Sequence, residues 1–450
     1  MDQGPGLAPP MWAASTLQAA LATVLICWPA WPGHMGYDPL FAYQESITGI
    51  STMTWPPLHA YMFWLSRKVG LGAGGVFATQ TFLLFLAAGL SISLLVRSRR
   101  LALLAMGLFA LAFVAIPPLL GVAMSLWRDV PTATLALGGL ALWLLAARRQ
   151  SLLLLVATAA CVGLDVALRY NAFPLFLLTA PLMLWRPWLG RPAGARPRLV
   201  AAAALVVSLG LAWASTHWRL PDLKHVPAAQ TTAAIQLFDL LGVTSCSGVN
   251  RLPAGVTEGW PITVAQVREA YDPRHLNMAF REIPDQPAIL STDAHGVVHD
   301  NWVRMIGEDP GCYLTHRFSV FLEQMGMVRR DVFYPVHGGI DPNPHGLALA
   351  HPALSNALTD YVARTSPDPW RRPALLYLLA ALAMLLLLAR RHPQWLLAVA
   401  LLGGAFANVA LLFLIGPAAD ARYIFPSNVV CAFLIAWALA AALERRDAPS

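Results

Sequence analysis

Long apolar runs separated by short polar loops dominate the chain. About ten runs of roughly 15–24 residues stand out, and they lie near 12–31, 75–96, 101–124, 130–147, 151–168, 172–186, 199–216, 372–389, 394–416 and 424–442. Such lengths suit α-helices that cross a hydrocarbon layer about 30 Å thick, and the run at 172–186 is short. The pattern predicts an all-α polytopic membrane protein with about ten or more transmembrane helices.

The short loops share basic residues unevenly, which predicts the orientation of the chain. With the N-terminus inside, the cytoplasmic loops hold thirteen arginines: Arg97, Arg99, Arg100, Arg148, Arg149, Arg186, Arg191, Arg196, Arg198, Arg390, Arg391, Arg445 and Arg446. The opposite loops hold five basic residues: Arg67, Lys68, Arg128, Arg169 and Arg422. The first run lacks a basic start and an Ala-x-Ala cleavage site, so we expect a retained helix.

One long segment is polar. From about 217 to 370 the chain is rich in Asp, Pro, His, Thr and Asn, and the orientation places this segment outside. We therefore expect an N-terminal transmembrane module at 1–216 with a first external loop at 33–70. A smaller non-cytoplasmic domain at 217–370 and C-terminal transmembrane helices at 371–450 follow.

Composition agrees with a membrane location. Hydrophobic residues make up 57% of the 450 positions and charged residues only 12%, which is too little charge to solvate a soluble surface. The net charge of +7 does not indicate nucleic-acid binding, because the basic residues sit in short clusters between apolar runs. We expect a multi-pass protein of the inner (plasma) membrane.

The five cysteines fall into two groups. Cys27, Cys161 and Cys431 lie in apolar runs, where small buried side chains are the simplest interpretation. Cys246 and Cys312 lie in the external segment, where an oxidising compartment favours a disulfide. Two unpaired thiols are the alternative.

Ionisable residues gather where apolar runs begin or end, and charges are costly there. Four clusters stand out: Tyr37-Asp38-Pro39 with Glu45 and His59, Trp127-Arg128-Asp129-Val130-Pro131, Asp165 with Arg169-Tyr170-Asn171, and Asp420-Ala421-Arg422-Tyr423. Residues after Pro39 alternate at helical spacing, which predicts a surface helix starting at Asp38-Pro39. All four clusters are expected on one side of the membrane at a similar depth.

Each cluster also has a purely structural interpretation. Arg128 and Asp129 could form a solvated turn, and Asp165 could pair with Arg169 four residues later on one helical face. Arg422 and Tyr423 could anchor a helix at the membrane interface. Together, however, the four clusters supply carboxylates and guanidinium groups. A carboxylate can remove a proton from an attacking hydroxyl, and guanidinium groups can hold a departing phosphate.

In their order along the chain these motifs resemble GT-C-fold glycosyltransferases, which use lipid-linked sugar donors. The aminoarabinose transferases, protein mannosyltransferases and related family-39-like proteins belong to this class. The resemblance lies in the acidic residue after the first span, the following helix, Pro56-Pro57-Leu58, and Trp127-Arg128-Asp129. Leu168-Arg169-Tyr170-Asn171 and Ala421-Arg422-Tyr423-Ile424-Phe425-Pro426 resemble later basic-aromatic patches of that class.

The resemblance implies roles for individual residues. Asp38 would activate the acceptor and Asp129 would be the second acidic residue. Arg128, Arg169 and Arg422 would hold donor phosphate, and Glu45, His59 and Tyr423 are further site candidates. Two departures matter: Pro39 stands where many relatives carry a second acidic residue, and Trp55 stands where they often carry Lys or His.

The leading hypothesis is therefore an inverting glycosyltransferase that moves a sugar from a polyprenyl-phosphate carrier to a lipid, glycan or protein acceptor on the non-cytoplasmic face, with the active site facing the periplasm or the outside. A transporter or lipid flippase is the first alternative, and it should show mid-span charges, broken helices and inverted repeats. A non-catalytic scaffold of the same fold is the second. The chain has no phosphate-binding Gly-rich motif that would indicate nucleotide binding.

Metal binding stays open at this stage. Asp38 and Asp129 could share Mg²⁺ or Mn²⁺, but three or more oxygen ligands would be needed and no others are evident. His295 and His299 are four residues apart, yet Gly296-Val297-Val298 between them is a poor helix former, so scattered surface histidines are the better interpretation.

Overall fold

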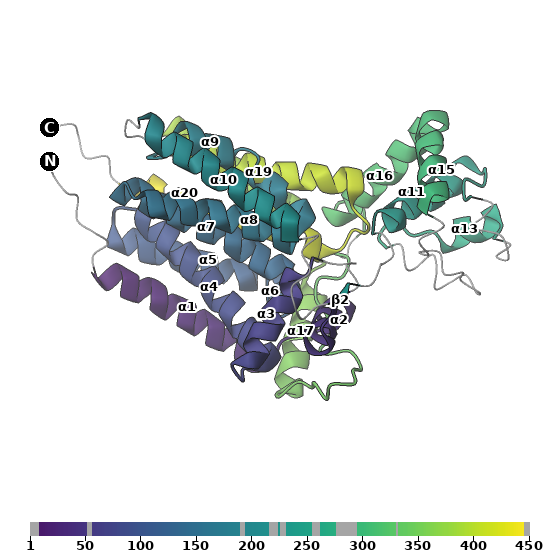
Figure 1. Ribbon diagram of the computed structural model, residues 1–450, viewed down its shortest axis with the longest axis horizontal. Helices are drawn as coiled ribbons and strands as arrows, with labels where there is room; N and C mark the ends of the chain where they lie inside the picture. The colour runs from purple at the N-terminus through teal and green to yellow at the C-terminus, as the bar shows by residue number, and fades with distance from the viewer. Residues whose placement is uncertain are drawn as a thin grey trace.

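The computed structural model describes residues 9–51, 56–189, 194–215, 224–225, 231–253, 262–275, 295–329 and 332–444. Long helices form a bundle, and a smaller helical group stands at one end of it (Figure 1). The bundle helices are α1 (Pro9–Ala30), α4 (Gly72–Leu95), α5 (Arg99–Ala115), α7 (Asp129–Arg149), α8 (Leu152–Leu168), α9 (Thr179–Trp185), α10 (Ala195–Ser215), α18 (Pro373–Ala389), α19 (Trp395–Ile415) and α20 (Phe425–Leu443). The outer group contains α11 (Thr231–Ser247), α13 (Val264–Ala270), α15 (His295–Glu308) and α16 (Pro310–Gln324).

Short elements lie between the bundle and the outer group. They are α2 (Tyr37–Thr48), α3 (Leu58–Lys68), α6 (Pro117–Ala123), η1 (Tyr170–Phe176), α17 (Pro352–Thr365), η3 (Pro369–Arg371) and η4 (Ala421–Ile424). Two-residue strands β1 (Ile50–Ser51) and β2 (Lys224–His225) pair in parallel. The predicted surface helix after the first span is therefore present as α2, with Asp38 in its first turn.

Within the described ranges, six helices are long and apolar enough to cross a membrane, and the bent pair α5–α6 makes a seventh. Two further apolar helices, α8 and α18, are 17 residues long, which is at the lower limit for a span. The chain is thus a multi-pass, almost entirely helical membrane protein, and the all-α fold class is confirmed. The expected count of about ten spans or more is higher than these helices provide.

The run at 172–186 accounts for part of that difference. It is not one helix, because η1 with Pro174 inside it gives way to the seven-residue α9. The run at 101–124 also differs from a single straight span. It bends by 88° between Ala115 and Pro117, since the proline ring at 117 cannot continue the preceding helix.

The bend turns α6 across the end of the bundle and places the start of α20 beneath it. Phe109 and Phe113 of α5 pack edge to face with ring centroids 5.5 Å apart, and Phe113 meets Phe425 at 6.5 Å. Asn408 of α19 donates a 2.9 Å hydrogen bond to Ser427 of α20 in the core. These contacts hold the N-terminal end of α20, where Arg422 and Tyr423 precede it.

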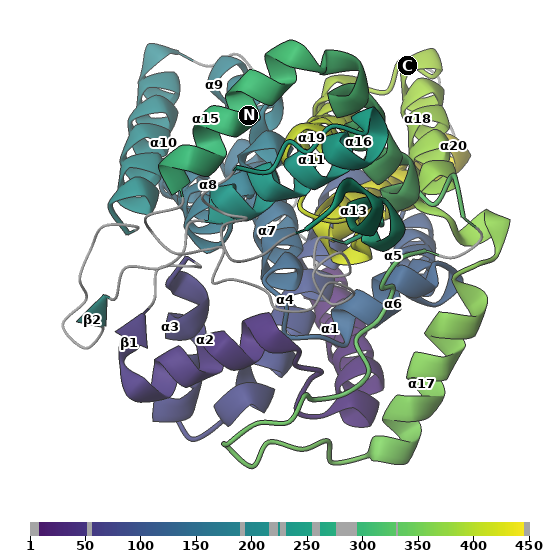
Figure 2. The same cartoon turned by 90° about the vertical axis from the view of Figure 1, so that its right-hand side faces the viewer.

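A strap, defined here as residues 332–341, crosses the same end of the bundle on its way to α17 (Figure 2). The Met35 N–H donates to the Gly339 carbonyl and the Asp341 N–H donates to the Met35 carbonyl, both at 2.9 Å. A side chain at Gly121 of α6 would clash with the Pro335 carbonyl oxygen. The strap is therefore bonded to the loop before α2 and pressed against α6.

The outer group has its own small core. Leu237, Leu240 and Leu241 of α11 pack with Val267 and Met305. The predicted disulfide is confirmed, because Cys246 of α11 and Cys312 of α16 are bonded. The expectation of a poor helix at 296–298 is wrong: these residues lie in α15, where Val298 is buried in the same core and the helix gains tertiary support.

A sealed polar network fastens the outer group to the bundle. Arg317 donates to Asp239 at 2.7 Å and to the Gly416 carbonyl at 2.8 Å, where α19 ends. The Ala419 N–H donates to the Arg274 carbonyl at 2.8 Å. The segment that leads from α19 into η4 is therefore held from outside by the outer group.

Candidate active site

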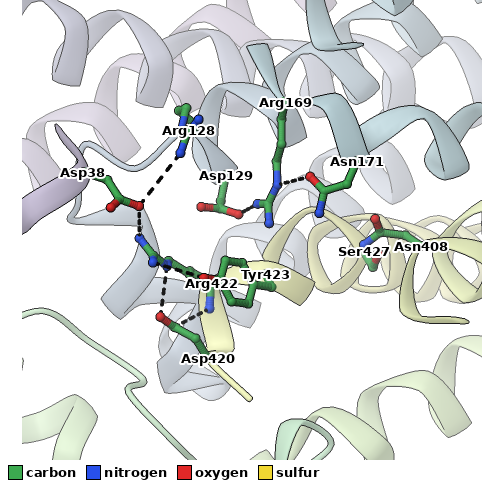
Figure 3. A network of polar contacts seen from close by, with 10 residues as sticks. All are labelled: Asp38, Arg128, Asp129, Arg169, Asn171, Asn408, Asp420, Arg422, Tyr423 and Ser427. Atoms are coloured by element: carbon green, nitrogen blue, oxygen red, sulfur yellow. Dashed lines mark hydrogen bonds and ion pairs between the residues drawn. The ribbon is translucent and has the colours of Figure 1, made fainter. Parts of the chain in front are cut away.

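The four predicted clusters meet at one end of the bundle, although they come from distant parts of the sequence (Figure 3). Arg422 Nη1 lies 2.7 Å from Asp38 Oδ2, and Arg128 Nη2 lies 3.9 Å from the same oxygen. Arg169 forms an ion pair with Asp129. Residues up to 384 positions apart are thus in direct contact.

Local structure explains why the three carboxylates are found here. Asp38 lies in the first turn of α2, and Asp129 is the first residue of α7. Asp420 caps η4 by accepting the Arg422 N–H at 3.1 Å. The unpaired N–H groups at helix starts favour negative charge, so each acidic residue also stabilises the helix that it begins.

Arg422 connects most of the site. Its Nε lies 2.9 Å from Asp420 and its Nη2 donates to the Tyr423 hydroxyl at 3.3 Å, in addition to the Asp38 contact. Its Cζ is 5.1 Å from the centroid of the Trp127 ring. One guanidinium is therefore oriented by two carboxylates and two aromatic residues, as its planar fork of donors permits.

Arg169 does not point toward Asp165, contrary to what the structural interpretation of the sequence expected. It ends α8 in an extended conformation, so its side chain leaves the helical face that carries Asp165. It pairs with Asp129 instead, donates to Asn171 Oδ1 at 2.8 Å and lies 5.2 Å from the Tyr423 ring centroid. The helical ion pair proposed for Asp165 and Arg169 is absent from the described contacts, and Asp165 is fully buried.

Burial and charge set the protonation of the site. Burial alone would raise the pKa of Asp38, but Arg422 and Arg128 outweigh it and lower the pKa below its usual range. Burial raises the pKa of Asp420 to about 6, because Arg422 offsets it only in part. Near neutral pH both carboxyl groups are ionised, and Asp420 titrates under mildly acidic conditions.

The three remaining candidates lie around this cluster. Tyr423 contacts both Arg169 and Arg422. His59 of α3 is buried, and burial together with Arg128 lowers its pKa to about 3, so it is neutral. Glu45 is buried within α2, two turns beyond Asp38.

A cleft of about 410 Å³ opens beside the cluster. Its walls come from the start of α2, from Trp127, from Asp420 and Arg422, and from the strap through Phe333, Tyr334 and Asp341. The strap residues are absent from the sequence-based candidates. Their one signal in the sequence is a set of aromatic, histidine and acidic residues within a Pro- and Gly-rich stretch.

Some candidates lie outside the described residues, among them Trp55, Arg191, Arg445 and Arg446. The described residues hold no group of three or more His, Cys, Asp or Glu side chains placed to bind a metal ion. Asp38 and Asp129 each face arginine instead. The charged residues of the cluster are three aspartates and three arginines. In such a set an incoming anion can replace a carboxylate as the partner of an arginine.

The fold and this cluster define a polytopic helical membrane protein with a cleft beside an arginine–aspartate cluster at one end of its bundle. No protein-family model matches the chain, and no curated protein sequence matches it. Among solved structures it is similar to ArnT from Cupriavidus metallidurans, a GT-C-fold aminoarabinose transferase, bound to undecaprenyl phosphate. The TM-score is 0.33 and the identity 16%, over 93% of this chain and 78% of that one. The apo ArnT structure gives a TM-score of 0.33 at 15% identity, over 94% and 76%.

Proposed function

We propose that this protein is a membrane glycosyltransferase that moves a sugar from a polyprenyl-phosphate-linked donor to a lipid, glycan or protein acceptor on the non-cytoplasmic face. The observation that carries the proposal is the junction of Asp38 with Arg422 and Arg128 beside the cleft. A positioned base and phosphate-binding groups are the two elements that this displacement requires.

The reaction is a single displacement with inversion. The acceptor hydroxyl oxygen forms a bond to the anomeric carbon of the sugar, and the bond from that carbon to the phosphate oxygen breaks. Asp38 takes the hydroxyl proton, and the polyprenyl phosphate leaves with the electron pair. Arg128, Arg169 and Arg422 stabilise the negative charge that develops on the departing phosphate.

The arginine contacts also explain how Asp38 becomes a competent base. Before the donor binds, Arg422 and Arg128 keep the pKa of Asp38 low and make the carboxylate a weak base. A donor phosphate competes for the same guanidinium groups. Drawing them away from Asp38 raises its basicity at the moment when the sugar is in place, which ties proton removal to donor binding.

Asp129 has a positioning role in this scheme. Its ion pair with Arg169, together with Asn171, fixes the direction of the Arg169 guanidinium. Asp129 is buried, with 6% of its side chain exposed, whereas 16% of the Asp38 side chain is exposed. The difference supports Asp38 as the base, because the acceptor reaches the more open carboxylate more readily.

The decisive experiment compares wild type with Asp38→Asn, using purified protein and a panel of radiolabelled polyprenyl-phosphate and polyprenyl-diphosphate sugars. We expect transfer or release by wild type and a loss of about 10²- to 10⁴-fold in the variant, the range typical of removing a general base. Donor binding and thermal unfolding should be retained. Full activity of Asp38→Asn would reject the assignment, and equal donor binding by both proteins without turnover would favour a transporter or a scaffold.

A further inference from the structure

The strap supplies a wall of the cleft that the proposed chemistry does not use. The cleft is lined by Tyr37 and Trp127 on the bundle side, and by Phe333, Tyr334 and Asp341 on the strap. Tyr37 is 70% exposed and Tyr334 is 39% exposed, which is high for large aromatic residues held at fixed positions. Aromatic rings that face a cleft in this way provide flat surfaces for a ligand.

Tyr334 is held in an unfavourable backbone conformation. Its φ is +50°, a left-handed value that side chains other than Gly, Asn and Asp adopt rarely. The ring lies 5.8 Å from the centroid of Trp127, and the neighbouring Phe333 carbonyl accepts the Ala421 N–H at 3.2 Å. Strain of this kind persists where the surroundings impose it, and it is concentrated at ligand-binding positions.

His337 connects Tyr334 to Asp341. The Tyr334 hydroxyl hydrogen-bonds His337 Nδ1, and His337 Nε2 lies 3.3 Å from Asp341 Oδ1. Burial lowers the pKa of His337, so its ring is neutral. One neutral tautomer suits both contacts: Nδ1 accepts from the tyrosine and Nε2–H points to the carboxylate.

Asp341 combines a fixed backbone with an exposed side chain. Its backbone N–H is bonded to Met35, which fixes the residue, while 48% of its side chain remains exposed. In the described part of the chain, the charged-group contact of the Asp341 carboxylate is with His337, and no arginine or lysine contact is found for Asp341. A carboxylate placed this way repels phosphate and accepts hydrogen bonds from neutral hydroxyl groups.

We propose that Tyr334 and Asp341 bind the sugar ring of the donor, with the tyrosine ring against the C–H face of the sugar and the carboxylate accepting hydrogen bonds from its hydroxyl groups. The inference rests on the proposed function of the same cleft. It divides the cleft into a phosphate side at Arg422 and a sugar side at the strap.

The test measures binding of two ligands to the full-length protein: undecaprenyl phosphate alone, and undecaprenyl phosphate linked to glucose, mannose, arabinose or N-acetylglucosamine. Wild type should bind at least one sugar-linked lipid more tightly than the bare lipid. Asp341→Ala should weaken binding of that sugar-linked lipid by about 10- to 100-fold and leave the bare lipid unaffected. The affinity of Asp341→Asn for the sugar-linked lipid should lie between those of wild type and Asp341→Ala. Tyr334→Ala should also reduce the preference for the sugar-linked lipid over the bare lipid.

Asp368→Asn is the matched control, because the Asp368 side chain has the same 48% exposure but lies at η3 and pairs with Arg371. It should bind both lipids as wild type does. The sugar-binding inference is overturned if Asp341→Ala keeps the preference for the sugar-linked lipid, or if it binds both lipids equally more weakly. Either result leaves the proposed function standing. If wild type binds neither lipid, the proposed function fails as well.

Discussion

Two arginine–aspartate networks in this molecule differ in what surrounds them. In the outer group, Asp239 and Arg317 are joined at 2.7 Å with neither side chain exposed, and Trp302 donates to the same carboxylate at 2.7 Å. At the end of the bundle, Asp38 and Arg422 are also joined at 2.7 Å, yet 16% of each side chain faces a cleft. The same pair of residue types and the same distance thus occur in a sealed setting and in an open one.

The partners differ as well. The Arg317 guanidinium donates to the Gly416 carbonyl, and His316 lies 3.1 Å from Asp239. The partners in this network are thus buried groups of the protein itself. Asp38 is shared between Arg422 and the more distant Arg128. An incoming anion can replace a carboxylate in the second network, whereas in the first it has no path. Access to a cleft therefore separates the network of the proposed active site from the buried network of the outer group.

The largest effect that separates the networks should come from Asp239→Asn. It leaves the buried Arg317 charge without its partner, so the outer group should lose about 3–5 kcal/mol of stability. Thermal unfolding in detergent, followed by tryptophan fluorescence, measures the change. Asp360→Asn removes an exposed pair with Arg364 and should change stability by less than about 0.5 kcal/mol. Equal melting temperatures for wild type and Asp239→Asn would show that the sealed network does not contribute this stability.

An intermediate effect is expected from Arg128→Gln. Removing a charged hydrogen-bond donor from phosphate costs about 1.5–3 kcal/mol, so kcat/KM for the donor should fall by about 10- to 100-fold. Arg128→Lys keeps the charge but not the planar fork, and should lie between wild type and Arg128→Gln. Steady-state kinetics measure both variants, with Arg364→Gln as the exposed control. An unchanged kcat/KM in Arg128→Gln would remove Arg128 from the phosphate side.

The smallest expected effect is a pH dependence. With a pKa of about 6, Asp420 is ionised at pH 7.5 and becomes protonated as the pH falls through 6. Protonation removes one of the two carboxylates that orient Arg422, so turnover should decline by up to about tenfold per pH unit below that point. Asp420→Asn should be slower at pH 7.5 and should lack this decline. The same acidic decline in Asp420→Asn would assign it to another group.

Much of the site could be predicted from the sequence, because charged residues at the ends of apolar runs are rare and costly. The orientation from loop arginines placed Asp38, Arg128, Arg169 and Arg422 on one side. The structure brings Asp38, Arg128 and Arg422 together and places Arg169 against Tyr423. The helix start at Asp38-Pro39 was also predictable, since proline favours the first helical turn.

Three features could not be predicted in the same way. The strap has no periodic pattern, and its conformation follows from contacts with Met35 and Gly121 that are far away in sequence. Arg169 lies four residues from Asp165, but spacing alone could not show that the helix ends between the two side chains. The helix at 295–308 forms against its local propensity, because Val298 and Met305 are buried in a tertiary core.

The bond between Arg317 and the Gly416 carbonyl has a consequence for how the chain divides into units. By sequence, residues 217–370 are an insertion between apolar runs and look separable from the rest. The structure nevertheless links them to the bundle, because a fully buried guanidinium from α16 bonds the carbonyl group at the end of α19. Excising the outer group would leave that carbonyl, and the approach to Arg422, without support. We therefore expect the end of the bundle that carries Arg422 to unfold together with the outer group.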